Sequence, residues 1–344
     1  MFIDPHVHCR DGKQSYKETI AHALSVAERA GMTAIFDMPN TDPPILTKSQ
    51  AEERISLAKK INSPVFYGLY MGITSKEQQI QSAIEAYDAF PEVIGLKMFA
   101  GHSIGNLGVT LEADQQKIYE TLAQIGYTGV IAVHCEKESL LKPQLWNPQL
   151  PITHTAARPP NAEVESVKDQ IRFAQDALFQ GTLHIAHISV PEAVDVVQQH
   201  KNTIKITCGV TPHHCILDSR IHETKNGIVY KCNPPLRLRS MADQMRDYLE
   251  TGMIDWIETD HAPHTMDEKI NVPHMSGLPG LPFYPKFVDM LKPRMNPEQL
   301  RGITFSNIVK TFKLDIKQRD CTSQKDITKN LAKEYAFDAY EHII

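Results

Sequence analysis

Short apolar runs rich in β-branched residues alternate with longer amphipathic stretches along most of the chain. The short runs predict strands at Phe2–His8, Met32–Met38, Val65–Met71, Val93–Phe99, Gly129–His134, Thr182–Ile188, Ile204–Cys208 and Ile254–Thr259. The longer stretches predict helices at Tyr16–Ala30, Lys48–Ile61, Lys76–Phe90, Leu111–Ile125, Ala162–Phe179, Pro191–His200 and Met241–Glu250. Strands that alternate with helices are typical of parallel βαβ units. Eight such units favour an α/β fold of the closed (β/α)8 barrel type over an open sheet.

The domain organisation follows from the same pattern. A chain of 344 residues fits one such barrel, and no low-complexity linker, charge block or internal repeat divides it. We therefore predict one barrel over residues 1–312 and a short helical C-terminal extension over 313–344. Gly31 and Gly181 each follow a predicted helix, where a glycine commonly ends the helix.

Composition and charge exclude several classes of partner. The 36 Lys and Arg against 41 Asp and Glu give a net charge of −5, so we expect neither nucleic acid nor an anionic membrane as a partner. No apolar run approaches the ~18 residues of a membrane span. The chain opens MFIDPHVH, which lacks the features of a secretory signal, so a cytoplasmic location is expected. The six cysteines contain no CxxC pair and are predicted to be free thiols.

Titratable side chains fall at the ends of predicted strands or inside them. His6 and His8 are two apart on the first strand, so their side chains point to the same face. The carboxyl ends of the strands meet at one face of a parallel barrel. The residues predicted to converge there are His6, His8, Lys97, His134, His187 and Asp260.

This combination of residue types indicates a metal centre. Imidazoles and a carboxylate are ordinary ligands of Zn²⁺, and four histidines with one aspartate exceed what one catalytic ion uses. Two ions need a bridging anion. Lys97 could supply it, because an ammonium beside two dications loses its proton and a neutral amine can add CO2 to form a carbamate. A single histidine or a single lysine on a strand is more often structural, so the hypothesis depends on the joint pattern.

The chain resembles the amidohydrolase superfamily, and within it the dihydroorotases. The segments that carry the resemblance are DPHVHCRDG (4–12), DMPNTDPP (37–44), GLKMF (95–99), AVHCE (132–136), HIAHIS (184–189), GVTPHH (209–214), KCNPPLR (231–237) and TDHAPHT with DEK (259–269). They occur in family order over about residues 1–312. Longer members of the family carry a flanking β-sandwich, which we do not expect here because the first strand begins at residue 2 and few residues follow the last match.

The resemblance implies roles for individual residues. His6, His8 and Asp260 would hold one zinc ion, His134 and His187 a second, and carboxylated Lys97 would bridge the two. For the substrate carboxylate the resemblance implies Arg10, Asn40 and His264, and for the pyrimidine ring it implies Asn233. A guanidinium suits bidentate binding of a carboxylate, which dihydroorotate has and most other cyclic amides lack.

The implied activity is the reversible hydrolysis of dihydroorotate to N-carbamoyl-aspartate, a step of pyrimidine biosynthesis. A hydroxide bridging the two metals would attack the ring amide, with Asp260 as the acid and base. Two alternatives stay open: another cyclic amidohydrolase (dihydropyrimidinase, hydantoinase or allantoinase), or an inactive scaffold for aspartate carbamoyltransferase. By the same resemblance we expect a homodimer, with aspartate carbamoyltransferase as a candidate partner.

Overall fold

The computed structural model describes residues 2–102, 107–316, 327–341 and 343. Eight parallel strands form one sheet in sequence order. They are β1 (Phe2–Val7), β2 (Met32–Asp37), β3 (Phe66–Gly72), β4 (Val93–Ala100), β5 (Val130–Cys135), β6 (Thr182–Ile185), β7 (Ile206–Val210) and β8 (Trp256–Ile257). The two edges of the sheet meet where β1 approaches the segment after β8. Val7 forms a parallel bridge with His261, and the His8 amide donates to the His261 carbonyl (2.8 Å). The sheet is therefore a nearly closed (β/α)8 barrel, as predicted.

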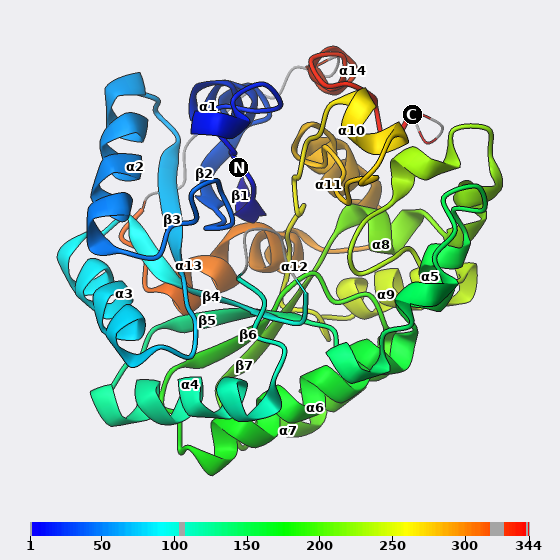
Figure 1. The fold of residues 1–344 in the computed structure, drawn as a ribbon. Coiled ribbons are helices and arrows are strands. Elements are labelled where there is room, and N and C mark those ends of the chain that lie inside the picture. The colour runs from blue at the N-terminus through cyan, green and yellow to red at the C-terminus, as the bar shows by residue number, and fades with distance from the viewer. Residues whose placement is uncertain (1, 103–106, 317–326, 342, 344) are drawn as a thin grey trace.

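Helices surround this sheet (Figure 1). They are α1 (Ile20–Arg29), α2 (Lys48–Ile61), α3 (Glu77–Ala89), α4 (Glu112–Ile125), α5 (Thr153–Ala157), α6 (Pro160–Asp176), α7 (Pro191–His200), α8 (Pro212–Ile216), α9 (Arg239–Glu250), α10 (Met266–Ile270), α11 (Tyr284–Leu291), α12 (Pro297–Arg301), α13 (Asn307–Phe312) and α14 (Ile327–Ala332). The apolar sides of the strands and helices form the core, in which Trp256 and Tyr70 are among the largest fully buried side chains. Near the C-terminus, Tyr340 stacks on Phe283 with ring centroids 3.9 Å apart.

All eight predicted strands are present, and the largest difference lies in β8. The predicted run Ile254–Thr259 is a strand only over Trp256–Ile257. The chain leaves the ladder because the Thr259 amide donates to the Asp4 carboxylate (3.0 Å) instead of to a neighbouring strand. The early end of β8 therefore follows from a side chain on β1.

The two glycines predicted to end helices differ. Gly31 has a φ of 77° directly after α1, as predicted. The prediction for Gly181 is wrong, because the left-handed residue after α6 is Leu178, with a φ of 54°. A Cβ on Gly181 would lie 2.5 Å from the carbonyl oxygen of Gly129. Gly181 therefore permits a close approach to the chain before β5.

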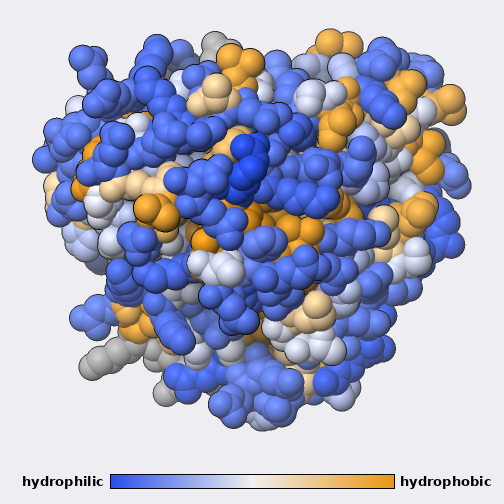
Figure 2. Space-filling view, turned by 90° about the horizontal axis from the view of Figure 1, so that it is seen from below, coloured by the Kyte–Doolittle hydropathy of each residue, from blue (hydrophilic) through white to orange (hydrophobic). Residues whose placement is uncertain are grey.

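The surface and the cysteines can be described over the same residues. Among the described residues no helix is long and apolar enough to cross a membrane. Figure 2 shows one face of the molecule, on which hydrophilic side chains predominate and hydrophobic ones form small groups. Cys9, Cys135, Cys208, Cys215 and Cys232 are free and buried, whereas Cys321 lies outside the described residues.

A buried ion pair fixes the turn that follows β1. Asp37, the last residue of β2, accepts hydrogen bonds from the Cys9 amide (2.8 Å), the Tyr67 hydroxyl (2.6 Å) and the Arg54 guanidinium (2.7 Å). Asp37 and Arg54 are almost fully buried. Because Cys9 lies between His8 and Arg10, this pair sets the position of both.

We predict that Asp37→Asn lowers the free energy of unfolding by about 3 kcal/mol or more, because it leaves the Arg54 cation buried without its counter-charge. The exposed pair Arg239–Asp243 is the matched control, and Asp243→Asn should cost about 0.5 kcal/mol or less. Urea unfolding measures both. Equal effects of the two substitutions would contradict the importance given to Asp37.

Candidate metal and substrate site

A cavity of about 320 Å³ opens among the carboxyl ends of the strands. Its lining includes five of the six predicted metal ligands, which lie on β1 and β5 or directly after β1, β6 and β8: His6, His8, His134, His187 and Asp260. Three of the four predicted substrate contacts, Arg10, Asn40 and Asn233, also line it. The cavity therefore brings together His6 and Asp260, which lie 254 positions apart in the sequence.

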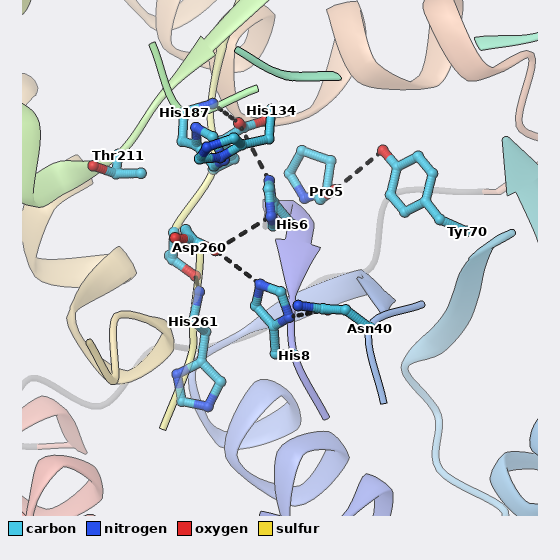
Figure 3. Close-up of polar contacts among 12 residues, drawn as sticks. Pro5, His6, His8, Asn40, Tyr70, His134, His187, Thr211, Asp260 and His261 are labelled. Carbon is cyan, nitrogen blue, oxygen red and sulfur yellow. Dashed lines mark hydrogen bonds and ion pairs between the residues drawn. The ribbon is translucent and has the colours of Figure 1, made fainter. Parts of the chain in front are cut away.

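The first group of predicted ligands is His6, His8 and Asp260. Their ligand atoms all lie within 4.8 Å of one another. Oδ1 of Asp260 is 2.9 Å from Nε2 of His8 and 3.2 Å from Nε2 of His6, as Figure 3 shows. Both imidazoles thus present Nε2 to the same carboxylate oxygen.

The second group is His134 and His187. Nδ1 of His134 lies 3.1 Å from Nε2 of His187, and the two labelled rings lie side by side in Figure 3. The ring of His187 is also 5.0 Å from the ring of His6, centroid to centroid. The two groups are therefore neighbours across one small space.

Two of the ring nitrogens that face away from this space, on His8 and His134, have their own acceptors. Nδ1 of His8 is 2.8 Å from Oδ1 of Asn40, and Nε2 of His134 is 2.9 Å from a carboxylate oxygen of Glu136. Metal-binding histidines usually donate their second ring N–H in this way, which fixes the tautomer and the ring orientation. The contacts therefore leave Nε2 of His8 and Nδ1 of His134 with lone pairs toward the shared space.

Glu258 contacts two further predicted ligands, the ring of His6 and the backbone of His187. One of its carboxylate oxygens is 3.5 Å from Nδ1 of His6 and accepts a short hydrogen bond from the backbone N–H of His187. The other oxygen is 3.0 Å from Nε2 of His184 and 3.1 Å from Nε1 of Trp256. This carboxylate is fully buried, and it links both groups of predicted ligands.

Lys97 is fully buried on β4, and its Nζ has no hydrogen-bond partner among the described residues. Burial lowers the pKa of its amine to about 8, although the charges of Glu258 and Asp260 act in the opposite direction. An unpaired buried ammonium is costly. A fraction of the Lys97 amine is therefore deprotonated near neutral pH.

Three residues at this face have backbone conformations that side chains rarely adopt. Arg10, His187 and Asp260 have φ values of 51°, 40° and 47°. Such a conformation costs a non-glycine residue of order 1–3 kcal/mol and persists where the surroundings enforce it, often at a functional site. At His187 the enforcing contact is the bond from its N–H to Glu258.

Burial sets the protonation of the imidazoles. It lowers the pKa of His6 to about 4, with the charge of Lys97 acting in the same direction. It also holds the pKa of His8 and of His187 well below the ordinary value. These rings are therefore neutral at physiological pH, which is the form that binds metal ions.

The predicted substrate residues differ in their exposure to the cavity. Arg10 is buried and lines the cavity, and its Nε has no partner among the described residues. Oδ1 of Asn40 faces His8 and Oδ1 of Asn233 faces Nε2 of His154 (2.9 Å), so both amides keep their N–H groups for a ligand. His264 does not line the cavity, and its Nε2 lies 3.2 Å from the Arg10 guanidinium. Contact between His264 and substrate stays a prediction.

The sequence-based prediction missed the carboxylates behind the ligands. Glu136 and Glu258 each stand two residues from a predicted ligand, His134 and Asp260, a spacing that puts side chains on the same face of an extended segment. That spacing could have identified them. Arg158 and Lys231 also line the cavity but lie on loops, so no periodicity marks them. Arg158 is held by an ion pair with Glu136.

The site meets the requirements of a pair of divalent ions. Ring nitrogens of four imidazoles and a buried carboxylate face one space, and Nζ of Lys97 is buried without a hydrogen-bond partner among the described residues. Oriented nitrogen and oxygen donors are the ligands that Zn²⁺ and related ions prefer. The residues present therefore fit such a metal centre.

Known structures share this architecture. The chain superposes on the L-hydantoinase (dihydropyrimidinase) of Arthrobacter aurescens with a TM-score of 0.78 and 22% identity, covering 91% of this chain and 70% of that one. The dihydropyrimidinase of Brevibacillus agri gives a TM-score of 0.75 and 19% identity, over 90% and 70% of the two chains. At such identities the likeness establishes the fold.

Sequence relatives are more specific, although no protein-family model matches the chain. The dihydroorotase of Methanosphaera stadtmanae is 30% identical over 326 residues, which are 91% of this chain and 70% of that protein. The dihydroorotase of Fusobacterium nucleatum is 30% identical over 345 residues, or 95% and 76% of the two chains. On this similarity, and with the site's residues in place, the chain belongs to the dihydroorotase family.

Proposed function

We propose that this chain is a dihydroorotase that interconverts dihydroorotate and N-carbamoyl-aspartate. One observation carries the choice of substrate: Arg10, whose buried Nε has no hydrogen-bond partner among the described residues, lines the same cavity as the predicted metal ligands. A buried guanidinium attracts an anion, and dihydroorotate has a carboxylate beside its reacting amide.

The predicted metal centre supports the chemistry. His6, His8 and Asp260 would hold one ion, His134 and His187 another, and Lys97 as a carbamate would contribute to both. When bound, two such ions would supply an acidified water and a Lewis acid for the substrate carbonyl. The identity of the ions as Zn²⁺ and the carbamate on Lys97 are part of this proposal.

The chain's own residues would carry the remaining steps. Arg10 and the N–H groups of Asn40 would bind the substrate carboxylate, which sets the ring amide toward Asp260. As water adds to the ring carbonyl carbon, Asp260 would take its proton and deliver it to the ring nitrogen when the C–N bond breaks. Ring closure would reverse each transfer and release water. The amide of Asn233 would orient the far side of the ring.

The domain and partner predictions belong to the same proposal. The end of α13 at Phe312 supports a barrel over 1–312, and the packing of Tyr340 on Phe283 supports an extension that returns to it. The homodimer, the contact with aspartate carbamoyltransferase and the cytoplasmic location stay predictions.

We expect dihydroorotate to be turned over with a kcat/KM at least about 100-fold above those of dihydrouracil, hydantoin and allantoin. Of these four compounds only dihydroorotate has a carboxylate that can pair with the Arg10 guanidinium. Arg10→Gln should lower kcat/KM for dihydroorotate by a similar factor, since it removes the charged partner of the carboxylate. Lys13→Gln, an exposed residue of the same loop, is the control and should change little. Faster turnover of hydantoin or dihydrouracil than of dihydroorotate would establish the alternative cyclic amidohydrolase.

A second prediction concerns Lys97. Lys97→Ala should lower the bound metal and abolish turnover, and short carboxylic acids should restore part of both by occupying the space of the carbamate. Lys97→Met keeps the length of the side chain and leaves no such space, so acids should not restore it. Metal analysis beside turnover measures both variants, and full metal content in Lys97→Ala without added acid would disprove the bridging role.

A further inference from the structure

A second cluster of potential ligands shares no residue with the predicted catalytic centre. It consists of His213 and His214 on α8 and Cys232, which precedes Asn233. The ligand atoms of these three residues all lie within 4.8 Å of one another, and all three side chains are buried. The two imidazole rings are 4.5 Å apart, centroid to centroid. Two neighbouring rings thus converge with a thiol inside the protein.

His213 has an unused ring nitrogen. Its Nδ1 lies 3.4 Å from the hydroxyl of Tyr340, whereas its buried Nε2 has no hydrogen-bond partner among the described residues. A buried polar atom left without a partner costs about 1–3 kcal/mol. Burial also holds the pKa of His213 well below its ordinary value, so the ring is neutral and has a lone pair to offer. This imidazole is therefore suited to bind a cation.

His214 has the orientation of a ligand. Its Nε2 is 3.1 Å from the carbonyl oxygen of Pro234, and because a carbonyl only accepts, Nε2 carries the proton. Its Nδ1 then presents the lone pair, at 2.8 Å from the hydroxyl of Thr211. A cation would replace that one bond, and Thr211 would still cap α8 by accepting from the His214 backbone N–H.

Cys232 supplies the third donor. Burial raises the pKa of its thiol to about 12, so the sulfur is protonated when no cation is near. Coordination to a metal ion deprotonates a thiol outright. A thiolate beside two neutral imidazoles then forms a donor set that favours Zn²⁺ over the harder Mg²⁺ or Ca²⁺.

We propose that His213, His214 and Cys232 bind a structural Zn²⁺ ion, in addition to the ions of the catalytic centre. Such an ion joins α8 to the segment that carries Asn233 into the cavity, close to Tyr340 of the C-terminal region. The proposal does not rest on the dihydroorotase activity, because no residue of the cluster lines the cavity.

X-ray absorption at the zinc edge tests this site on the unaltered, zinc-saturated protein. The predicted catalytic ligands offer only nitrogen and oxygen, so a sulfur neighbour at about 2.3 Å reports the second site. Two ions at the catalytic centre and one at the second site would give about one sulfur neighbour for every three zinc ions. A zinc-saturated protein whose spectrum contains no sulfur neighbour would overturn the proposal, whatever its activity.

Two matched variants assign the sulfur. Cys232→Ser should lose the sulfur neighbour and about one zinc ion per chain. Cys215→Ser should retain both. Cys215 is a buried, free thiol on α8, the helix that carries His213 and His214, but it lies outside the cluster. Retention of the sulfur neighbour in Cys232→Ser would contradict the assignment. If Cys232→Ser does not fold, the spectrum of the unaltered protein still decides.

Discussion

The carboxylate of Glu258 is the contact on which the geometry of the predicted centre depends. It joins His6 on β1 to the backbone of His187 after β6, and it is anchored by His184 and Trp256. Burial alone would raise the pKa of this carboxyl, but His184 and His6 outweigh it and hold the pKa well below the usual range. Glu258 is therefore ionised. Space for it exists because residue 209 is glycine, where a Cβ would lie 2.4 Å from the Glu258 oxygen.

Around this carboxylate the barrel buries several polar atoms that have no suitable partner within the described part of the chain. Imidazole lone pairs face the lone pairs of a carboxylate, and the Lys97 amine and one nitrogen of Arg10 have no partners among the described residues. Left empty, such an arrangement would be costly. Metal ions would complete one half of it and a substrate carboxylate the other, so binding of these ligands would remove the cost of the unpartnered groups.

Sequence patterns were sufficient where a regular period or a motif carries the information. The alternation of apolar runs identified all eight strands, and the position of His6, His8 and Asp260 at strand ends predicted their convergence. Patterns failed where tertiary contacts decide. The end of β8 depends on Asp4, 255 positions away. The place of His264 behind Arg10 likewise depends on a contact that no local period encodes.

In this interpretation one barrel mouth would assemble a pair of metal ions beside a carboxylate-binding arginine. A crystal structure of the zinc-loaded protein with N-carbamoyl-aspartate is the decisive test. We expect one ion between His6, His8 and Asp260, a second at His134 and His187, a carbamate on Lys97, and a ligand carboxylate on Arg10. A ligand bound with Arg10 unpaired, or an unmodified Lys97 beside two fully occupied ions, would contradict it.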